Sequence, residues 1–205
     1  MTITLVAGLA LAGVGWGAMF GLGRPGFWGR ATGAGLAIGA YTLAVQHARV
    51  ADLLRPNLVD LALGVAGAAT LYGVFWAGNA VLRRRLPAIA RQIDDLYTVR
   101  SVRRRTDRLP IPVVLVVVGT CEELFWRGLV QARAGFLVAL ACYAAVHVWE
   151  RKTVLVLAAA TGGAFWGALF AMRGTLVAPI VSHVLWDLAV VIWFPFTDAP
   201  PAPER

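Results

Sequence analysis

Six ionisable side chains inside otherwise apolar stretches are the first feature of this sequence that points to chemistry. A charged group in hydrocarbon costs several kcal/mol unless it is paired or hydrated, so such residues are functional candidates. Proton transfer by a carboxylate or an imidazole is the chemistry that these residue types suggest. All six lie in the second half of the chain: Glu122, Glu123, Arg127, His147, His183 and Asp187.

The three charged residues of the first group predict an ion pair with one carboxylate to spare. Glu123 and Arg127 are four residues apart, so they share a helix face and are expected to pair. Glu122 points about 100° away around the helix, and one arginine cannot fully neutralise two carboxylates. In a dry site the remaining glutamate is suited to act as a general base. The alternative is a structural ion pair with a spare glutamate facing water.

Two further segments carry a histidine with a polar residue four positions away. Tyr143 precedes His147 on the same helix face, near the end of an apolar stretch. A lone histidine in that place is structural, interfacial or part of a site. His183 and Asp187 also share a helix face, where they could form an orienting pair, bind a metal or line a polar cavity.

The two cysteines, Cys121 and Cys142, both lie inside apolar stretches, so a disulfide framework is not expected. Cys121 directly precedes Glu122 and could be read as a thiol nucleophile. Buried cysteine is usually inert packing, and we favour that interpretation.

The elements that must position these residues are predicted to be membrane helices. Hydrophobic residues make up 59% of the chain and charged residues 15%, against about 25% charged in soluble domains. Apolar stretches approach the length that crosses about 30 Å of hydrocarbon, and they do not alternate as membrane strands do. We therefore expect one domain, an all-α polytopic transmembrane bundle of about seven spans: Thr2–Leu22, Ala31–Gln46, Leu58–Leu82, Ile111–Gln131, Gly135–Trp149, Val154–Met172 and Thr175–Phe194.

A basic segment at residues 83–109 separates the accessory N-terminal helices (residues 1–82) from the half that carries the chemistry (residues 110–195). Apolar residues recur in it at helical spacing, which predicts a basic amphipathic helix on the cytoplasmic leaflet. A solvated loop is the alternative. Residues 196–205 hold several prolines and are expected to form a flexible tail.

The net charge of +8 follows from arginines between the apolar stretches, as the positive-inside rule requires, so nucleic-acid binding is not expected. With the basic segment inside, the N-terminus lies outside and the C-terminal tail inside. The first stretch has no basic residue before it and no clear cleavage site, so we read it as a retained helix.

Small residues at four-residue spacing let membrane helices approach closely. Gly13, Gly17 and Gly21 form one such row, and Gly163 with Gly167 forms another. The alternative is the general enrichment of glycine in membrane helices.

Three segments together resemble the CAAX-protease and bacteriocin-processing family of intramembrane glutamate proteases. Residues 122–127 (EELFWR) resemble its Glu-Glu-x-x-x-Arg signature. Residues 143–147 (YAAVH) resemble the second signature, usually Phe-x-x-x-His, and residues 183–187 (HVLWD) the third, His-x-x-x-Asn or His-x-x-x-Asp. All three occur in order, each on its own predicted span, over roughly residues 111–194.

The resemblance implies a helical intramembrane endopeptidase with a cavity open to water and no required cofactor or metal. By motif match Glu122 is the general base that activates water together with His147. His183 and Asp187 match the positions that support the oxyanion, while Glu123, Arg127 and Tyr143 match supporting positions. Such a mechanism needs a positioned water, a base and donors aimed at the developing oxyanion.

Two departures from the family pattern bear on these roles. Tyr143 replaces the usual Phe and adds one hydroxyl. Asp187 stands where the eukaryotic prenyl-protein proteases have Asn, and an ionised carboxylate cannot donate to an oxyanion. We expect Asp187 to orient His183 as the donor instead.

Three other functions compete with the protease. A zinc protease would use His147, His183 and a carboxylate, but the sequence has no His-Glu-x-x-His segment. A non-catalytic scaffold or immunity-type protein would keep the polar residues as structural contacts. A transporter would predict broken helices in both halves.

For the protease, the expected partners are the bilayer and a protein or peptide substrate. The substrate would be a prenylated C-terminus, a leader peptide or a sorting signal. The composition, rich in Ala, Gly and Arg, favours a bacterial inner membrane.

Overall fold

The computed structural model describes residues 3–22, 26–99 and 110–197, and this part of the chain is helical without any strand. The all-α prediction is therefore confirmed. The elements are α1 (Ile3–Gly21), α2 (Phe27–Leu53), α3 (Leu58–Arg85), α4 (Pro87–Val99), α5 (Ile111–Glu123), the π-helix η1 (Leu124–Gln131), α6 (Ala132–Ala134), α7 (Phe136–Val146), the 3-10 turn η2 (His147–Glu150), α8 (Thr153–Arg173), α9 (Val177–Leu188) and the π-helix η3 (Ala189–Trp193).

Each of the seven predicted apolar stretches corresponds to a helix or to consecutive helical elements. Three helices, α1, α3 and α8, are long and apolar enough to cross a membrane by length and composition. The helical segments 136–150 and 177–193 are apolar but shorter. A membrane bundle is thus supported, while the number of seven spans stays a prediction.

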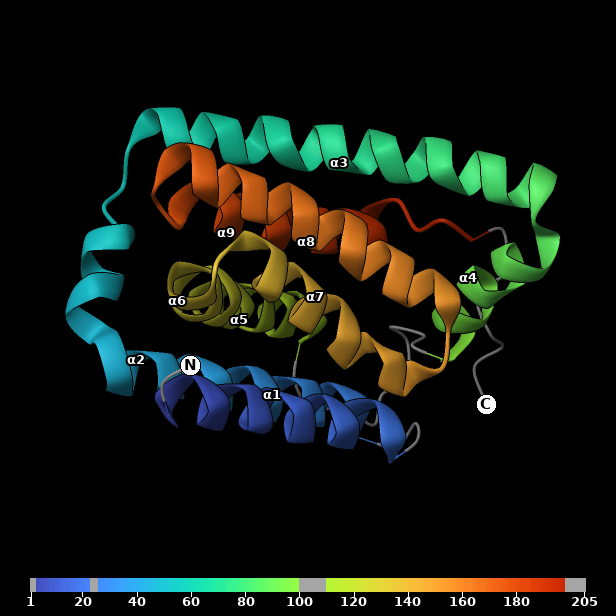
Figure 1. The fold of residues 1–205 in the computed structure, drawn as a ribbon. Coiled ribbons are helices and arrows are strands. Elements are labelled where there is room, and N and C mark those ends of the chain that lie inside the picture. Colours follow the sequence, from blue (N-terminus) through green and yellow to red (C-terminus); the bar gives the residue numbers. More distant parts are fainter. Residues whose placement is uncertain (1–2, 23–25, 100–109, 198–205) are drawn as a thin grey trace.

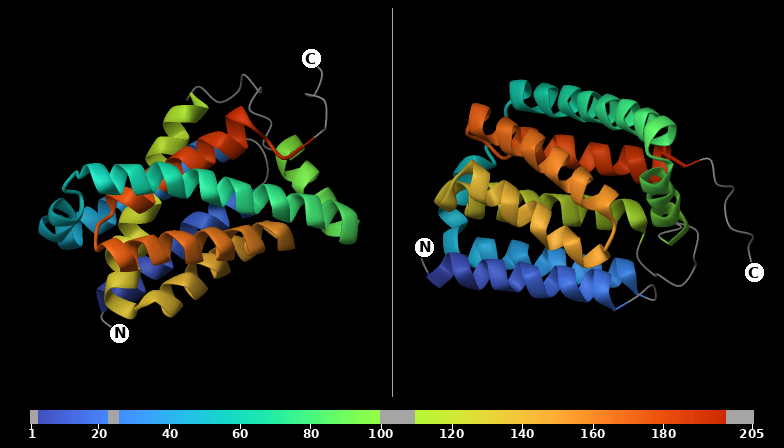
Figure 2. Two further views of the ribbon diagram at one scale, coloured as in Figure 1. Left: turned by 90° about the horizontal axis from the view of Figure 1, so that it is seen from above. Right: turned by 45° about the vertical axis from the view of Figure 1, so that its right-hand side comes forward.

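The helices form a layered bundle (Figure 1). α1 and α2 lie along one side, α3 lies along the opposite side, and the elements of the second half run between them, as a second view also shows (Figure 2). α5 contacts α2 and α9, and its continuation η1 contacts α2, α7 and α8. The segment with the acidic and arginine residues therefore lies at the centre, with partners from both halves of the chain.

At a kink in α2, a side chain of the N-terminal half forms a hydrogen bond with this central segment. Gln46 departs from helical geometry (φ −159°, ψ 37°) and its Nε2 donates to the carbonyl of Gly128 in η1 at 2.8 Å. The predicted apolar stretch ended at Gln46, whereas the helix continues through the kink to Leu53. A π-helix shifts its backbone hydrogen bonds by one residue, and the glutamine side chain satisfies one of its carbonyls.

The two rows of glycine have different outcomes. A Cβ added at Gly163 would lie 2.7 Å from Tyr143 Cδ1, and one at Gly167 would lie 2.7 Å from Phe136 Cε2, so close approach of α7 and α8 is confirmed. A Cβ added at Gly13 or Gly21 would meet no described atom within 4 Å. General glycine enrichment accounts for those two positions.

The predicted basic helix differs from the observed one in where its charge lies. Arg83, Arg84 and Arg85 form the last turn of α3. Between Pro87 and Val99, α4 carries two acidic residues and only one basic residue, Arg91. The helix is therefore amphipathic but not itself basic. Residues 100–109, which hold the remaining arginines of the segment, and the tail from residue 198 lie outside the described residues.

Polar contacts fasten α4 across one end of the bundle. Asp94 pairs with Arg83 at 2.8 Å, and Asp95 pairs with Lys152 at 2.6 Å, just before α8 begins. The Tyr97 hydroxyl donates to the carbonyl of Val190 in η3 at 2.7 Å. These contacts join α4 to α3, α8 and the end of α9.

A buried carboxylate closes the opposite end of the bundle. Asp60, in the first turn of α3, is 0% exposed. Its two oxygens accept from Arg173 Nε at 2.6 Å and from the Thr175 hydroxyl at 2.9 Å. The Leu176 amide also donates to the Leu53 carbonyl at 2.9 Å. The connection between α8 and α9 is thereby held against the start of α3, an ion pair that sequence analysis did not anticipate.

Candidate active site

The helix that carries Glu122 and Glu123 widens into a π-helix directly after them. Every residue from Glu122 to Gln131 is buried. Their neighbours come from α2, α7, α8 and α9. Short π-helical segments are rare and occur frequently at functional sites.

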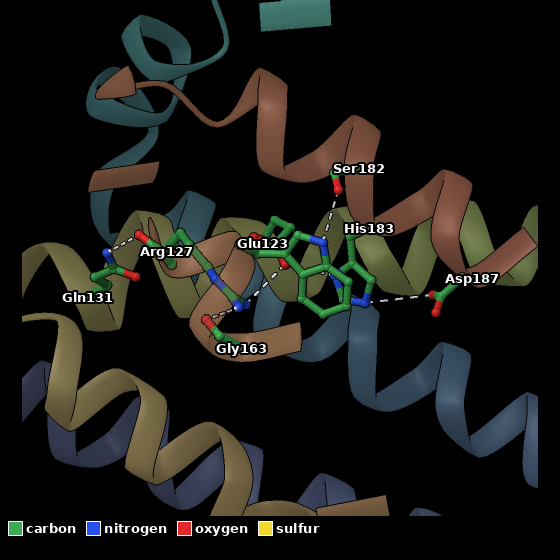
Figure 3. A network of polar contacts seen from close by, with 9 residues as sticks. Glu123, Arg127, Gln131, Gly163, Ser182, His183 and Asp187 are labelled. Atoms are coloured by element: carbon green, nitrogen blue, oxygen red, sulfur yellow. Dashed lines mark hydrogen bonds and ion pairs between the residues drawn. The ribbon is translucent and has the colours of Figure 1, made fainter. Parts of the chain in front are cut away.

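The predicted ion pair is present and fully buried. Arg127 Nη1 lies 3.0 Å from Glu123 Oε1, with both side chains almost inaccessible. Arg127 Nη2 donates to the carbonyl of Gly163 in α8 at 3.2 Å (Figure 3). The guanidinium carbon also lies 5.0 Å from the ring centre of Tyr143 and 5.6 Å from that of Trp166. A buried cation needs such compensation, because desolvation is costly for an isolated charge.

A second arm of this network extends from Glu123 to α9. His183 Nδ1 lies 2.7 Å from Glu123 Oε1, and His183 Nε2 lies 3.7 Å from Asp187 Oδ2 (Figure 3). The first distance is a hydrogen bond and the second is longer than one. Asp187 was predicted to orient His183, but the shorter contact to the ring comes from Glu123.

A glycine on α5 lies directly against this arrangement. A Cβ added at Gly119 would lie 3.3 Å from Val184 Cγ2, 3.6 Å from Asp187 Oδ2 and 3.8 Å from His183 Cγ. α5 and α9 therefore pack at van der Waals distance where the histidine and the aspartate face α5.

Glu122 lies beside the same network on a different face. It is 7% exposed and within electrostatic reach of His183 and Asp187, with the Tyr143 side chain as a hydrogen-bonding neighbour. Its Oε2 is buried and has no hydrogen-bond partner among the described residues. The structure thus brings Glu122, Tyr143, His183 and Asp187 together, as the motifs predicted.

His147 lies in the turn η2 at the end of α7, in a largely aromatic environment. Its Nδ1 lies 2.7 Å from the Tyr143 carbonyl oxygen, which can only accept, so Nδ1 carries a proton. In the neutral ring the lone pair is then on Nε2. Rings of Trp16, Phe20 and Tyr143 lie at centroid distances of 6.3, 6.0 and 5.0 Å. Two of these rings belong to α1, so the N-terminal half lines the surroundings of this histidine.

Two aspects of the region bear on the alternatives. Cys121 and Cys142 are free, and the Cys121 sulfur packs so closely on α2 that a Cβ at Gly39 would lie 2.6 Å away. Packing is the better interpretation of Cys121. No cluster of three or more His, Cys, Asp or Glu side chains able to hold a metal ion is found among the described residues.

Residues that sequence reasoning missed are Trp166 and Ser182. Trp166 stacks on His183, and Ser182 accepts a hydrogen bond from the Trp166 indole. Neither belongs to one of the three motifs, so only their positions in adjacent packed helices reveal them.

A comparison with protein families agrees with this arrangement. The model of the family described as Type II CAAX prenyl endopeptidase Rce1-like matches residues 105–189. This segment is Rce1-like. The match includes all three motifs and confirms the resemblance to the CAAX-protease family. No curated protein and no solved structure matched the chain.

The matching family is described as a prenyl endopeptidase, and its model covers less than half of the chain. The apolar helices described above agree with a location in the bilayer.

Proposed function

We propose that this protein is an intramembrane endopeptidase in which Glu122 and His147 activate water against a peptide bond of a membrane-associated protein or peptide. The observation that carries the proposal is the carboxylate of Glu122, buried beside a network of cations and acids with Oε2 unpaired within the described chain. Glu123 is committed to Arg127 and His183, so Glu122 is the carboxylate that remains for chemistry.

In the proposed reaction Glu122 accepts a proton from water as the oxygen bonds to the substrate carbonyl carbon. The carbonyl oxygen becomes an oxyanion in a tetrahedral intermediate. Collapse of the intermediate breaks the carbon–nitrogen bond, and the same proton passes to the leaving amine. The protonated Nδ1 of His147 fixes a tautomer in which Nε2 can accept, as a partner in water activation requires.

His183 has the character of the donor to the oxyanion. Its Nδ1 donates to Glu123, and its Nε2 lies on the other side of the ring, 3.7 Å from the Asp187 carboxylate. A lone pair there would face an acid oxygen unfavourably, whereas an imidazolium N–H between two carboxylates is favoured. The doubly protonated ring presents a donor at Nε2. Asp187 then acts through His183 rather than touching the oxyanion itself.

The location and substrate form part of the same proposal. We place seven spans in a bacterial inner membrane, with α4 at the cytoplasmic surface. The substrate classes are a prenylated C-terminus, a leader peptide or a C-terminal sorting signal. The prenylated C-terminus is favoured by the description of the matching family.

The decisive experiment compares the peptides of cells that lack the gene with those of cells that express wild-type protein, Glu122→Gln, His147→Ala or the control Glu150→Gln. Membrane and secreted peptides are measured by mass spectrometry. Products formed by the wild type and the control, but lost in both other variants at equal protein levels, support the protease. A wild-type peptide profile equal to that without the gene, or full product formation by Glu122→Gln, would favour the scaffold and overturn the proposal.

A further inference from the structure

Trp166 of α8 lies flat against the imidazole of His183. The two ring centres are 3.7 Å apart and their planes differ by 16°. Both side chains are buried. Among the described ring pairs, Trp166 is the ring that stacks on the face of this imidazole. The contacts of His183 with Glu123 and Asp187 are made through its ring nitrogens.

The indole is itself fixed by a second contact to the same helix. Its Nε1–H donates to the Ser182 hydroxyl at 3.2 Å, and Ser182 is completely buried next to His183 in α9. Trp166 therefore holds two consecutive residues of α9. Its ring also lies under the guanidinium of Arg127, 5.6 Å from the centre, so it contacts both arms of the polar network.

Small residues leave the space that this contact requires. A Cβ added at Gly162 would lie 2.8 Å from Trp166 Cζ3, too close for the indole to stay in place. A Cβ added at Gly67 of α3 would lie 3.1 Å from Ser182 Oγ. The indole and its serine partner are thus enclosed from two sides by backbone that carries no side chain.

We propose that Trp166 is a positioning residue for His183, resting on the oxyanion-supporting role of His183 in the proposed function. The hydrogen bond to Glu123 fixes one point of the imidazole, and the stacked indole fixes the plane about that point. Together they aim Nε2 at the position beside Asp187. The face of the indole also favours a positively charged ring over a neutral one.

The experiment uses the full-length protein with ¹⁵N-labelled histidine, because the chain has three histidines and His183 can be assigned by substitution. Trp166→Leu removes the ring, and Trp166→Phe keeps an aromatic face without the N–H. Gly162→Ala displaces the indole without altering it, and Ser182→Ala removes only its hydrogen-bond acceptor. Gly13→Ala is the matched control, since its added Cβ would meet no described atom within 4 Å.

We expect Trp166→Leu and Gly162→Ala to move the ring nitrogen and proton resonances of His183 while those of His47 stay in place. The rate of formation of the Glu122-dependent peptide products should fall by roughly 10- to 100-fold, the range known for partners that orient a metal-binding histidine. Trp166→Phe should partly restore the wild-type His183 resonances and the wild-type rate of product formation. Gly13→Ala should change neither quantity.

Unchanged His183 resonances in Trp166→Leu, or in Gly162→Ala and Ser182→Ala if Trp166→Leu does not fold, would overturn the positioning role. Displaced resonances with undiminished product formation would overturn it as well. If Glu122→Gln forms products as the wild type does, the proposed function fails instead, and the resonances still report whether Trp166 orients His183.

Discussion

Glu123 and His183 are joined by a hydrogen bond of 2.7 Å that crosses from α5 to α9. The same carboxylate oxygen of Glu123 lies 3.0 Å from Arg127. One buried oxygen of Glu123 thus contacts both His183 and Arg127. This double contact distinguishes Glu123 from the adjacent Glu122. Glu123 organises the network, whereas Glu122 lies beside it.

The two glutamates are expected to respond differently to the same substitution. Glu123→Gln leaves Arg127 without its counter-ion in a buried place, which costs roughly 3–5 kcal/mol of stability. Glu122→Gln breaks no ion pair seen among the described residues and should leave the unfolding temperature close to that of the wild type while abolishing hydrolysis. Thermal unfolding in detergent, together with the peptide comparison above, measures both. Equal losses of stability would contradict this division of roles.

Gly163 is expected to tolerate no side chain. An added Cβ would lie 2.7 Å from the ring of Tyr143, and the Gly163 carbonyl accepts from Arg127. Gly163→Ala should therefore destabilise the protein by about 1–3 kcal/mol through overpacking. Gly73→Ala in α3, where the added Cβ meets no described atom within 4 Å, is the control. Denaturation of both variants in the same detergent compares them directly.

The buried carboxylate of Asp60 predicts a strong coupling to Arg173. Removing one member of a buried ion pair costs about 3–5 kcal/mol, and the Asp60 side chain is fully inaccessible. Because Asp60 is fully inaccessible and Arg173 is partly exposed, we expect Arg173→Met, which leaves a buried carboxylate without its counter-ion, to destabilise more than Asp60→Asn. A double-mutant cycle gives the coupling free energy, and additive losses would show that the pair does not act as a unit.

The attachment of α4 should depend on pH. The hydrogen bond from Arg83 lowers the pKa of Asp94 below its ordinary value of 3.8. The contribution of this carboxylate is therefore complete above about pH 4 and is lost as the pH falls through the lowered pKa. The pair is partly exposed, so its value is about 0.2–1 kcal/mol. The protection of α4 amides against hydrogen exchange, relative to the intrinsic exchange rate at each pH, should fall at low pH in the wild type. In Asp94→Asn this protection should already be low at neutral pH.

Chelators should leave hydrolysis unchanged if glutamate activates the water. A zinc mechanism would need His147, His183 and a carboxylate on one ion, but no cluster of three or more His, Cys, Asp or Glu side chains able to hold a metal ion is found among the described residues. Product formation in membranes treated with a chelator, then supplied with zinc, measures this. Loss on chelation with recovery by zinc would exclude the glutamate mechanism.

The helical class could be predicted from the sequence, and the candidate site residues could be named from it, because both depend on local spacing; the catalytic roles of those residues stay a prediction. Two charges four residues apart share a helix face in any bundle, so the pair of Glu123 with Arg127 was readable in advance. The motif order likewise identified His147, His183 and Asp187. The Rce1-like match covers residues 105–189, the segment that contains these motifs.

Partners that are distant in sequence could not be predicted, because helix periodicity does not specify which faces meet. The hydrogen bond between Glu123 and His183, the stacking of Trp166 and the pairing of Asp60 with Arg173 all join separate helices. Gly119 shows the same dependence, since a Cβ added there would contact Val184 and Asp187 of a different helix.

The sequence by itself determined that this chain forms apolar helices and that the six candidate residues inside its apolar stretches lie in the second half. The length of the apolar stretches and the cost of burying an unpaired charge suffice for that conclusion. Tertiary structure alone decided which acid orients His183. Both Asp187 and Glu123 were available by composition, but the packing of α5 against α9 places Glu123 at hydrogen-bond distance and leaves Asp187 at 3.7 Å.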